Sequence, residues 1–218
     1  RLRLVMETDG SLSLIASKKS NVRNPDGLKG KNISVSGNTF VEYATDEVMK
    51  RACLHPGEVN KPEINNIPLR LMMLEDGQIS ASFLPGPATA IALNDGHTAL
   101  LNTRQMGLHC TGIVFSEKAI TEKDEEIRRF ITGYNLGVKY LQTHPQNEWT
   151  EILVKEFGLQ EKAAMQIDLP DYRPATRPSY HDIEKIIAWL KSKGAIPDYY
   201  PGENLVDTTF IPGTPEPQ

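Results

Sequence analysis

The chain has 218 residues, of which 39% are hydrophobic and 24% are charged, a composition that suits a globular protein with a sizeable core. Its formal net charge of −4 argues against nucleic acid as a partner, because phosphate binding favours a basic face. Its apolar residues form no run of about 18, the length that a membrane-spanning helix requires.

The first part of the chain alternates strands and helices. Residues 1–6 and 11–17 have strand patterns on either side of the turn-like pair Asp9-Gly10. After a stretch rich in Asn, Pro and Gly, residues 33–35 predict a strand. An amphipathic helix follows, with an apolar stripe formed by Val41, Ala44, Val48 and Ala52.

The pattern continues with a helix over residues 68–77, for which we expect Leu69, Met72 and Met73 to face inward and Gly77 to be the left-handed cap. A strand follows and breaks at Pro85-Gly86-Pro87. A helix that ends at Gly96 and strands near residues 99–101 and 112–115 come next. This alternation predicts βαβ units and a largely parallel sheet.

Long helices dominate the rest of the chain. Thr121 and Asp124 resemble a capping box, and Ser179 with Asp182 marks the start of the last helix. The first long helix has an inward stripe that consists of Ile127, Phe130, Ile131, Tyr134, Val138 and Leu141. A shorter helix, which contains Trp149 and Phe157, stops at Gly158.

The sequence contains no pattern for catalysis or for metal binding. The cysteines Cys53 and Cys110 are far apart, so they indicate neither a zinc site nor a disulfide framework, and we expect both to pack as small apolar residues. The five histidines lack metal-binding spacing, and no nucleophile elbow is present. We therefore predict no catalytic residue, no metal and no cofactor.

The turn Ser36-Gly37-Asn38-Thr39 lies where the strand at residues 33–35 passes into a helix. A helix start presents unpaired N–H groups and partial positive charge, and Gly37 lets a ligand approach the backbone. The turn can therefore bind a carboxylate, sulfonate, phosphate or ring carbonyl. Equally, Asn38 or Thr39 can merely cap the helix. The residues alone leave both alternatives open.

Four segments in this order resemble the bacterial solute-binding proteins of ABC importers, in the group that serves sulfonates, nitrate, taurine and thiamine-pyrimidine precursors. The segments are DGSLSLIASKKSNVRNPDGLKGKNISVSGNTFVEY, PLRLMMLEDGQISASFLPGP, GLHCTGIVFSEKAI and IRRFITGYNLGVKYLQTHP. The resemblance covers the chain from about Thr8 to Phe210.

The resemblance implies the α/β type II periplasmic-binding-protein fold, in which two lobes joined by two crossing strands hold a ligand between them. Residues 1–18 and 111–218 would form the first lobe, and residues 19–110 the second. We expect the first lobe to be incomplete, its opening strand–helix units lying upstream of residue 1.

The same resemblance implies the ligand contacts. Two departures matter: Ser80 replaces an acidic residue of the family pattern, and Gly86 replaces a glutamate, which leaves a less negative loop and puts a cationic ligand in doubt. The implied contacts are Asp9, Gly10, Ser11, Gly37, Asn38, Thr39, Tyr43, Gly86, Pro87 and His109.

The function implied is that of a non-enzymatic receptor for a small anionic or heterocyclic solute. It would act in the periplasm or at the cell surface with an ABC permease and its ATPase, and meet the membrane only through them or through a lipid anchor. Two alternatives remain open. One is an enzyme on the same fold, of the pyrimidine-precursor-synthase type, and the other is the effector domain of a transcriptional regulator.

Overall fold

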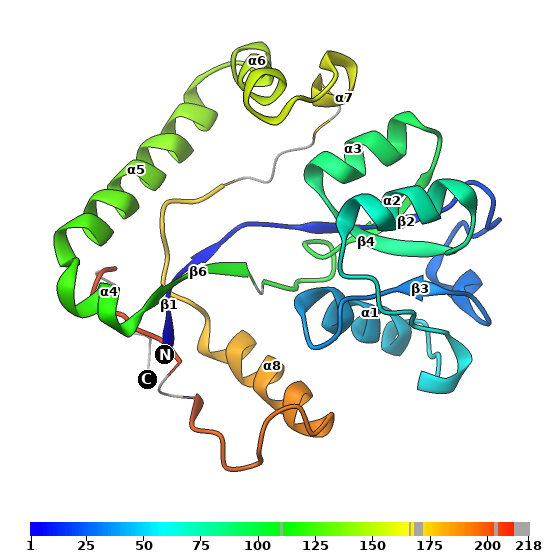
Figure 1. Cartoon of the computed structure of the whole chain (residues 1–218), viewed down its shortest axis with the longest axis horizontal. Helices are drawn as coiled ribbons and strands as arrows, with labels where there is room; N and C mark the ends of the chain where they lie inside the picture. The colour runs from blue at the N-terminus through cyan, green and yellow to red at the C-terminus, as the bar shows by residue number, and fades with distance from the viewer. Residues whose placement is uncertain (110, 166, 168–171, 203–204, 212–218) are drawn as a thin grey trace. The chain divides into compact units, whose positions relative to one another are not determined.

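A computed structural model describes residues 1–109, 111–165, 167, 172–202 and 205–211 (Figure 1). The chain divides into two compact units. Unit 1 consists of Arg1–Gly10, His109–Pro145 and Pro170–Gln218, and unit 2 consists of Ser11–Leu108 and Gln146–Leu169. Residues 11–18 and 146–169 thus group with the unit that contains most of the predicted second lobe. The lobe boundaries at residues 18 and 110 stay a prediction.

Unit 2 contains a four-stranded sheet in the order β3-β4-β2-β5. The strands are β2 (Leu12–Ala16), β3 (Ile33–Ser34), β4 (Ala81–Pro85) and β5 (Thr98–Asn102). β3 and β4 are parallel, whereas β2 is antiparallel to both of its neighbours, β4 and β5.

The prediction of a largely parallel sheet is therefore right for the directions of β3, β4 and β5 and wrong for β2. The three parallel strands are joined by helical connections, as the βαβ pattern requires. β2 instead precedes the first helical connection and inserts between β4 and β5 against their direction. Residue patterning identifies a strand but does not fix its direction.

Helices pack on both faces of this sheet. Figure 1 shows α2 (Ile67–Asp76) and α3 (Gly86–Asn94) on one face and α1 (Phe40–Arg51) on the other. The sequence also forms the short 3-10 helices Pro25–Leu28 and Pro56–Glu58. The core under α2 and α3 contains Ile15, Ile64, Leu74, Ile79, Leu84, Ala88 and Ala92.

The predicted inward face of α2 is wrong in part. Leu69 and Met72 are 40% and 55% exposed, whereas Arg70 is only 2% exposed. The Nε atom of Arg70 donates a hydrogen bond to the backbone oxygen of Ile64 at 2.6 Å, which draws a charged residue onto the buried face. The predicted cap is confirmed, since Gly77 has a φ of 76°.

Two further helices belong to unit 2: α6 (Gln146–Phe157) and α7 (Glu161–Met165). Ala90 of α3 packs with Ile167, and Leu153 and Leu159 lie against this small cluster. Cys53 is exposed, so the prediction that it fills an apolar space is wrong, while Cys110 lies outside the described residues.

Unit 1 is built around two antiparallel strands, β1 (Leu2–Thr8) and β6 (Thr111–Ser116). Its helices are α4 (Glu117–Glu122), α5 (Asp124–Thr143) and α8 (Tyr180–Ser192). Its core consists of Val5, Met6, Ile127, Ile131, Phe210 and Ile211.

The helix starts of unit 1 differ from the prediction at one place. The Thr121 hydroxyl donates to the backbone oxygen of Glu117 at 3.0 Å instead of capping α5, because a separate helix, α4, precedes it. Ser116 caps α4, and Ser179 caps α8 as predicted, its side chain accepting the Asp182 amide at 3.3 Å.

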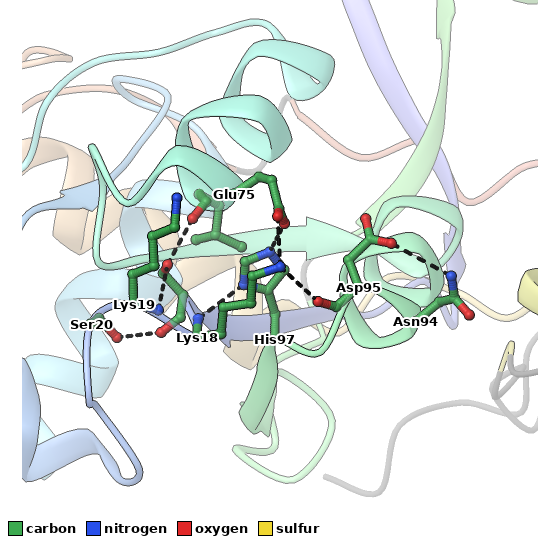
Figure 2. A network of polar contacts seen from close by, with 9 residues as sticks. Lys18, Lys19, Ser20, Glu75, Asn94, Asp95 and His97 are labelled. Carbon is green, nitrogen blue, oxygen red and sulfur yellow. Dashed lines mark hydrogen bonds and ion pairs between the residues drawn. The ribbon is translucent and has the colours of Figure 1, made fainter.

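A polar cluster joins β2 to the loop before β5 (Figure 2). The His97 side chain is fully buried; its Nδ1 atom accepts the Lys18 backbone N–H at 3.0 Å, and its Nε2 atom lies 2.7 Å from Glu75 Oε2. Lys18 Nζ donates to Glu75 Oε1 at 2.6 Å and to the Asp95 backbone oxygen at 3.0 Å. Lys18 follows β2, Glu75 lies near the end of α2, and His97 comes just before β5. The cluster therefore connects these three elements.

Candidate functional site

The register of the unit 2 sheet brings three of the predicted segments to one edge. Leu12 at the start of β2 pairs with Pro85 at the end of β4. β3 and β4 are parallel, with Ser34 opposite Ser82, so both strands end at this same edge. Ser11, residues 36–39 and residues 85–87 therefore share one edge, where the carboxyl ends of parallel strands commonly hold ligands.

In the turn after β3, Asn38 and Thr39 take part in ordinary helix capping. The Thr39 hydroxyl accepts the Val41 amide at 3.3 Å and donates to the Ser36 backbone oxygen at 2.7 Å. The Asn38 backbone N–H donates a hydrogen bond to Glu42 Oε2 at 2.8 Å. Asn38 has a φ of 55°, a conformation that Asn tolerates better than most residues. Its backbone N–H is thus already used.

Gly37 makes room for a carboxylate of the protein itself. A Cβ atom at this position would lie 3.0 Å from Glu63 Oε1 and 3.2 Å from Glu63 Oε2. Asn65 Nδ2 donates to Glu63 Oε1 at 3.3 Å, and the Ser36 hydroxyl donates in turn to Asn65 Oδ1. The start of α1 is therefore faced by negative charge.

Three carboxylates, those of Glu42, Asp46 and Glu63, gather around this helix start. The Lys61 Nζ atom lies 2.7 Å from Asp46 Oδ1 and 3.5 Å from Glu42 Oε1. Burial lowers the pKa of Lys61, but the hydrogen bond and charge of Asp46, helped by Glu42, outweigh it and raise the pKa overall. Carboxylates this close to a helix start offset its partial positive charge and disfavour an anion.

The remaining predicted contacts of unit 2 differ in how open they are. No atom lies within 4 Å of a Cβ placed on Gly86, so the chain is open at the start of α3, where Pro87 follows. Tyr43 is 5% exposed and lies in the core. Its contact with a ligand stays a prediction.

The predicted contacts of unit 1 lie at the end of β1 and before β6. Both Asp9 carboxylate oxygens accept hydrogen bonds from Arg173: its backbone N–H donates to Oδ2 and its Nε donates to Oδ1, each at 2.8 Å. Arg173 Nη2 also lies 3.3 Å from Glu7 Oε1. Asp9, the largest contributor, together with Glu7 raises the pKa of Arg173.

Close packing sets the backbone next to Asp9. A Cβ at Gly10 would lie 3.0 Å from Thr111 Oγ1, and that hydroxyl donates to the Thr8 backbone oxygen at 2.9 Å. The His109 side chain is exposed. Asp9, Gly10 and His109 thus belong to unit 1, and the other seven predicted contacts belong to unit 2.

Sequence reasoning missed Arg173 and Glu63. Arg173 is 164 residues away from Asp9, and Glu63 reaches Gly37 only because Val35 and Glu63 form a parallel bridge. Neither pairing has a characteristic local spacing. The charge balance of the site could therefore not be predicted from the residues near each motif.

Two kinds of feature are absent from the described residues. No group of three or more His, Cys, Asp or Glu side chains within them has a metal-binding arrangement. Likewise, no described helix has both the length and the apolar character to cross a bilayer.

Residues 8–148 match the family model described as NMT1/THI5 like. No curated protein matches the chain significantly. Solved structures do. The periplasmic aliphatic sulphonate binding protein SsuA from Escherichia coli is 13% identical, with a TM-score of 0.78 over 98% of this chain and 71% of that one.

The periplasmic nitrate-binding protein NrtA from Synechocystis PCC 6803 is 8% identical, with a TM-score of 0.77 over 93% of this chain and 63% of that one. The desulfurization enzyme DSZB is 11% identical, with a TM-score of 0.62 over 96% of this chain and 78% of that one. At these identities the likeness shows the fold, and the predicted fold class is confirmed.

Proposed function

The chain belongs to the NMT1/THI5-like family, and from this premise we propose that it is an extracytoplasmic receptor that binds a small solute for an ABC importer. The observation that carries the proposal is the shared sheet edge in unit 2, where Ser11, residues 36–39 and residues 85–87 converge. The fold shared with sulphonate-binding and nitrate-binding proteins supports it.

The proposed solute is an uncharged heterocycle that carries N–H donors, in preference to a free anion. The carboxylates of Glu42, Asp46 and Glu63 at the start of α1 favour a donor over a negative group. In unit 1, the carboxylates of Glu7 and Asp9 share the Arg173 guanidinium. The open chain at Gly86 leaves space for a ring.

The test is a calorimetric and thermal-shift comparison of neutral amino-substituted heterocycles with sulfonates and nitrate. A bound solute at 100 times its Kd should add about 2.7 kcal/mol to the free energy of unfolding. Binding of a sulfonate with no response to any heterocycle would contradict the solute class but leave the receptor role standing. No response to either class would count against the receptor role itself.

The proposed solute contact of the turn at residues 36–39 is tested by Asn38→Gly, which removes the side chain and keeps the left-handed backbone conformation accessible. We expect a roughly threefold to tenfold weaker affinity, the loss of one hydrogen bond. The matched control is Asn21→Gly, since Asn21 has a φ of 59° and lies beyond the opposite end of β2. Equal solute affinities in the two variants would argue against a solute contact at Asn38.

The proposed partners are an ABC permease and its ATPase, and the proposed location is the periplasm or the cell surface, with or without a lipid anchor. The likeness to DSZB keeps one alternative, an enzyme on this fold. Turnover of a bound heterocycle by the purified protein would favour that alternative over a receptor.

A further inference from the structure

Unit 1 contains a cavity between its sheet and α8. The cavity has a volume of about 260 Å³. One wall comes from Leu4 of β1 and from Thr111 and Gly112 of β6, and the loop that follows α8 closes another side. The apolar lining consists mainly of Leu4, Ile183, Ile186, Ile187, Leu190 and Ile196.

Apart from Tyr200 in the loop after α8, the polar residues of the lining gather at one end. Glu7 pairs with Gly112 near the end of β1, and the Glu7 carboxylate accepts the Ser179 amide at 3.2 Å where α8 begins. Glu7, Thr111 and Ser179 therefore mark the end at which α8 starts, and His109 precedes β6 there. Leu190 lies near the other end of α8, almost three turns away.

At the polar end, Glu7 shares a cation with Asp9. Glu7 is largely buried, with 11% of its side chain exposed, and its negative charge faces the Arg173 guanidinium 3.3 Å away and the N-terminus of α8. A carboxylate that is already paired with a cation can still accept a hydrogen bond, but it gains little from a second cation. The cavity thus suits a neutral polar group at this end.

We propose that this cavity binds a small neutral molecule that has an apolar ring system and one N–H or O–H donor. The ring lies among the isoleucine and leucine side chains, and the donor faces Glu7. This site lies outside the sheet edge of unit 2, although two of its lining residues, Glu7 and His109, also belong to the argument for the receptor.

The volume sets the size of the ligand. An engineered apolar cavity of about 150 Å³ holds benzene, and drug-sized ligands occupy pockets of about 300–1,000 Å³. At about 260 Å³ the cavity fits a bicyclic molecule. Indole has a suitable size, is uncharged and carries one N–H donor, while indene has the same shape without the donor.

The first experiment measures binding of indole and indene to the unmodified protein by calorimetry and ligand-observed NMR. We expect indole to bind and indene to bind roughly threefold to tenfold more weakly, the contribution of one hydrogen bond. Equal binding of the two would overturn the role of Glu7. An absence of indole binding at millimolar concentration would overturn the site.

The second experiment fills the cavity with Leu190→Trp, for which Lys185→Trp on the exposed part of α8 is the matched control. We expect indole binding to be lost in the first variant and kept in the second. Should Leu190→Trp fail to fold by circular dichroism, Ile186→Phe replaces it. Equal binding to the filled and control proteins overturns the proposal, as does an unmodified protein that is an oligomer and becomes monomeric when the cavity is filled.

Discussion

At the scale of single residues, the buried imidazole of His97 shows how a polar side chain can be part of a core. Because the Lys18 backbone N–H can only donate, His97 Nδ1 must be the acceptor. The Nε2 atom therefore carries the ring proton and donates a hydrogen bond to Glu75 Oε2. Both ring nitrogens are satisfied, so burial carries no penalty for an unpaired group. The cluster in Figure 2 thus connects three elements, and it lies beyond the end of β2 that is opposite to Leu12.

The same cluster predicts a specific pH dependence. The hydrogen bond from Lys18, with a smaller contribution from His97, lowers the pKa of Glu75 below its ordinary value of 4.5. A lowered folded-state pKa adds stability above the unfolded pKa and loses it as pH falls through the folded value. Glu75→Gln should therefore be less stable than the parent at pH 7, and the difference should shrink below about pH 4.5.

Urea unfolding at pH 7, 5, 4 and 3 measures this difference. Glu156→Gln is the control, since it makes the same chemical change at an exposed position of α6. A stability difference between Glu75→Gln and the parent that is constant across this pH range would contradict the proposed role of the carboxylate.

At the scale of elements, two glycines should respond in opposite directions to the same substitution. Gly77 ends α2 with a φ of 76°, which an alanine adopts at a cost of about 1 kcal/mol. Gly133 lies within α5, and nothing lies within 4 Å of a Cβ built there. Alanine at this position should stabilise the helix by about 0.5–1 kcal/mol.

Gly77→Ala should therefore lower the urea midpoint, and Gly133→Ala should raise it without a change in the denaturant slope. Each variant serves as the control for the other, because both add a single methyl group. A decrease for both, or an increase for both, would show that the local backbone conformation does not decide the effect.

Elements whose signals are local could be predicted from the sequence. The left-handed cap at Gly77, the serine cap of α8 and the strand-to-helix passage at residues 33–40 all depend on neighbours within a few residues. The antiparallel direction of β2 depends instead on pairing with strands more than 60 residues away. For the same reason, local signals place residues 36–39 between a strand and a helix, but they place neither Ser11 nor the Glu63 carboxylate beside them.

At the scale of the whole molecule, the two units differ in how their sheets are built. The chain passes from one unit to the other four times, and unit 1 is assembled from three separate segments. Within the described residues, its sheet has two strands, residues 2–8 and 111–116, with single bridges from β1 to Thr176 and Val206, while that of unit 2 has four strands. A two-stranded sheet is marginally stable unless other elements cover it.

The two tryptophans make this difference measurable, because Trp149 lies in α6 of unit 2 and Trp189 lies in α8 of unit 1. Both side chains are partly buried, so their fluorescence should change when their own unit unfolds. Trp149→Phe leaves a reporter in unit 1, and Trp189→Phe leaves one in unit 2. We expect the reporter in unit 1 to change at a lower urea concentration, because its unit has the smaller sheet and an incompletely filled cavity.

Far-UV circular dichroism of both variants should span both transitions and so serves as the internal control. Coincident fluorescence curves would mean that the units unfold as one cooperative structure, and the reverse order would mean that packing by α5 and α8 outweighs the size of the sheet.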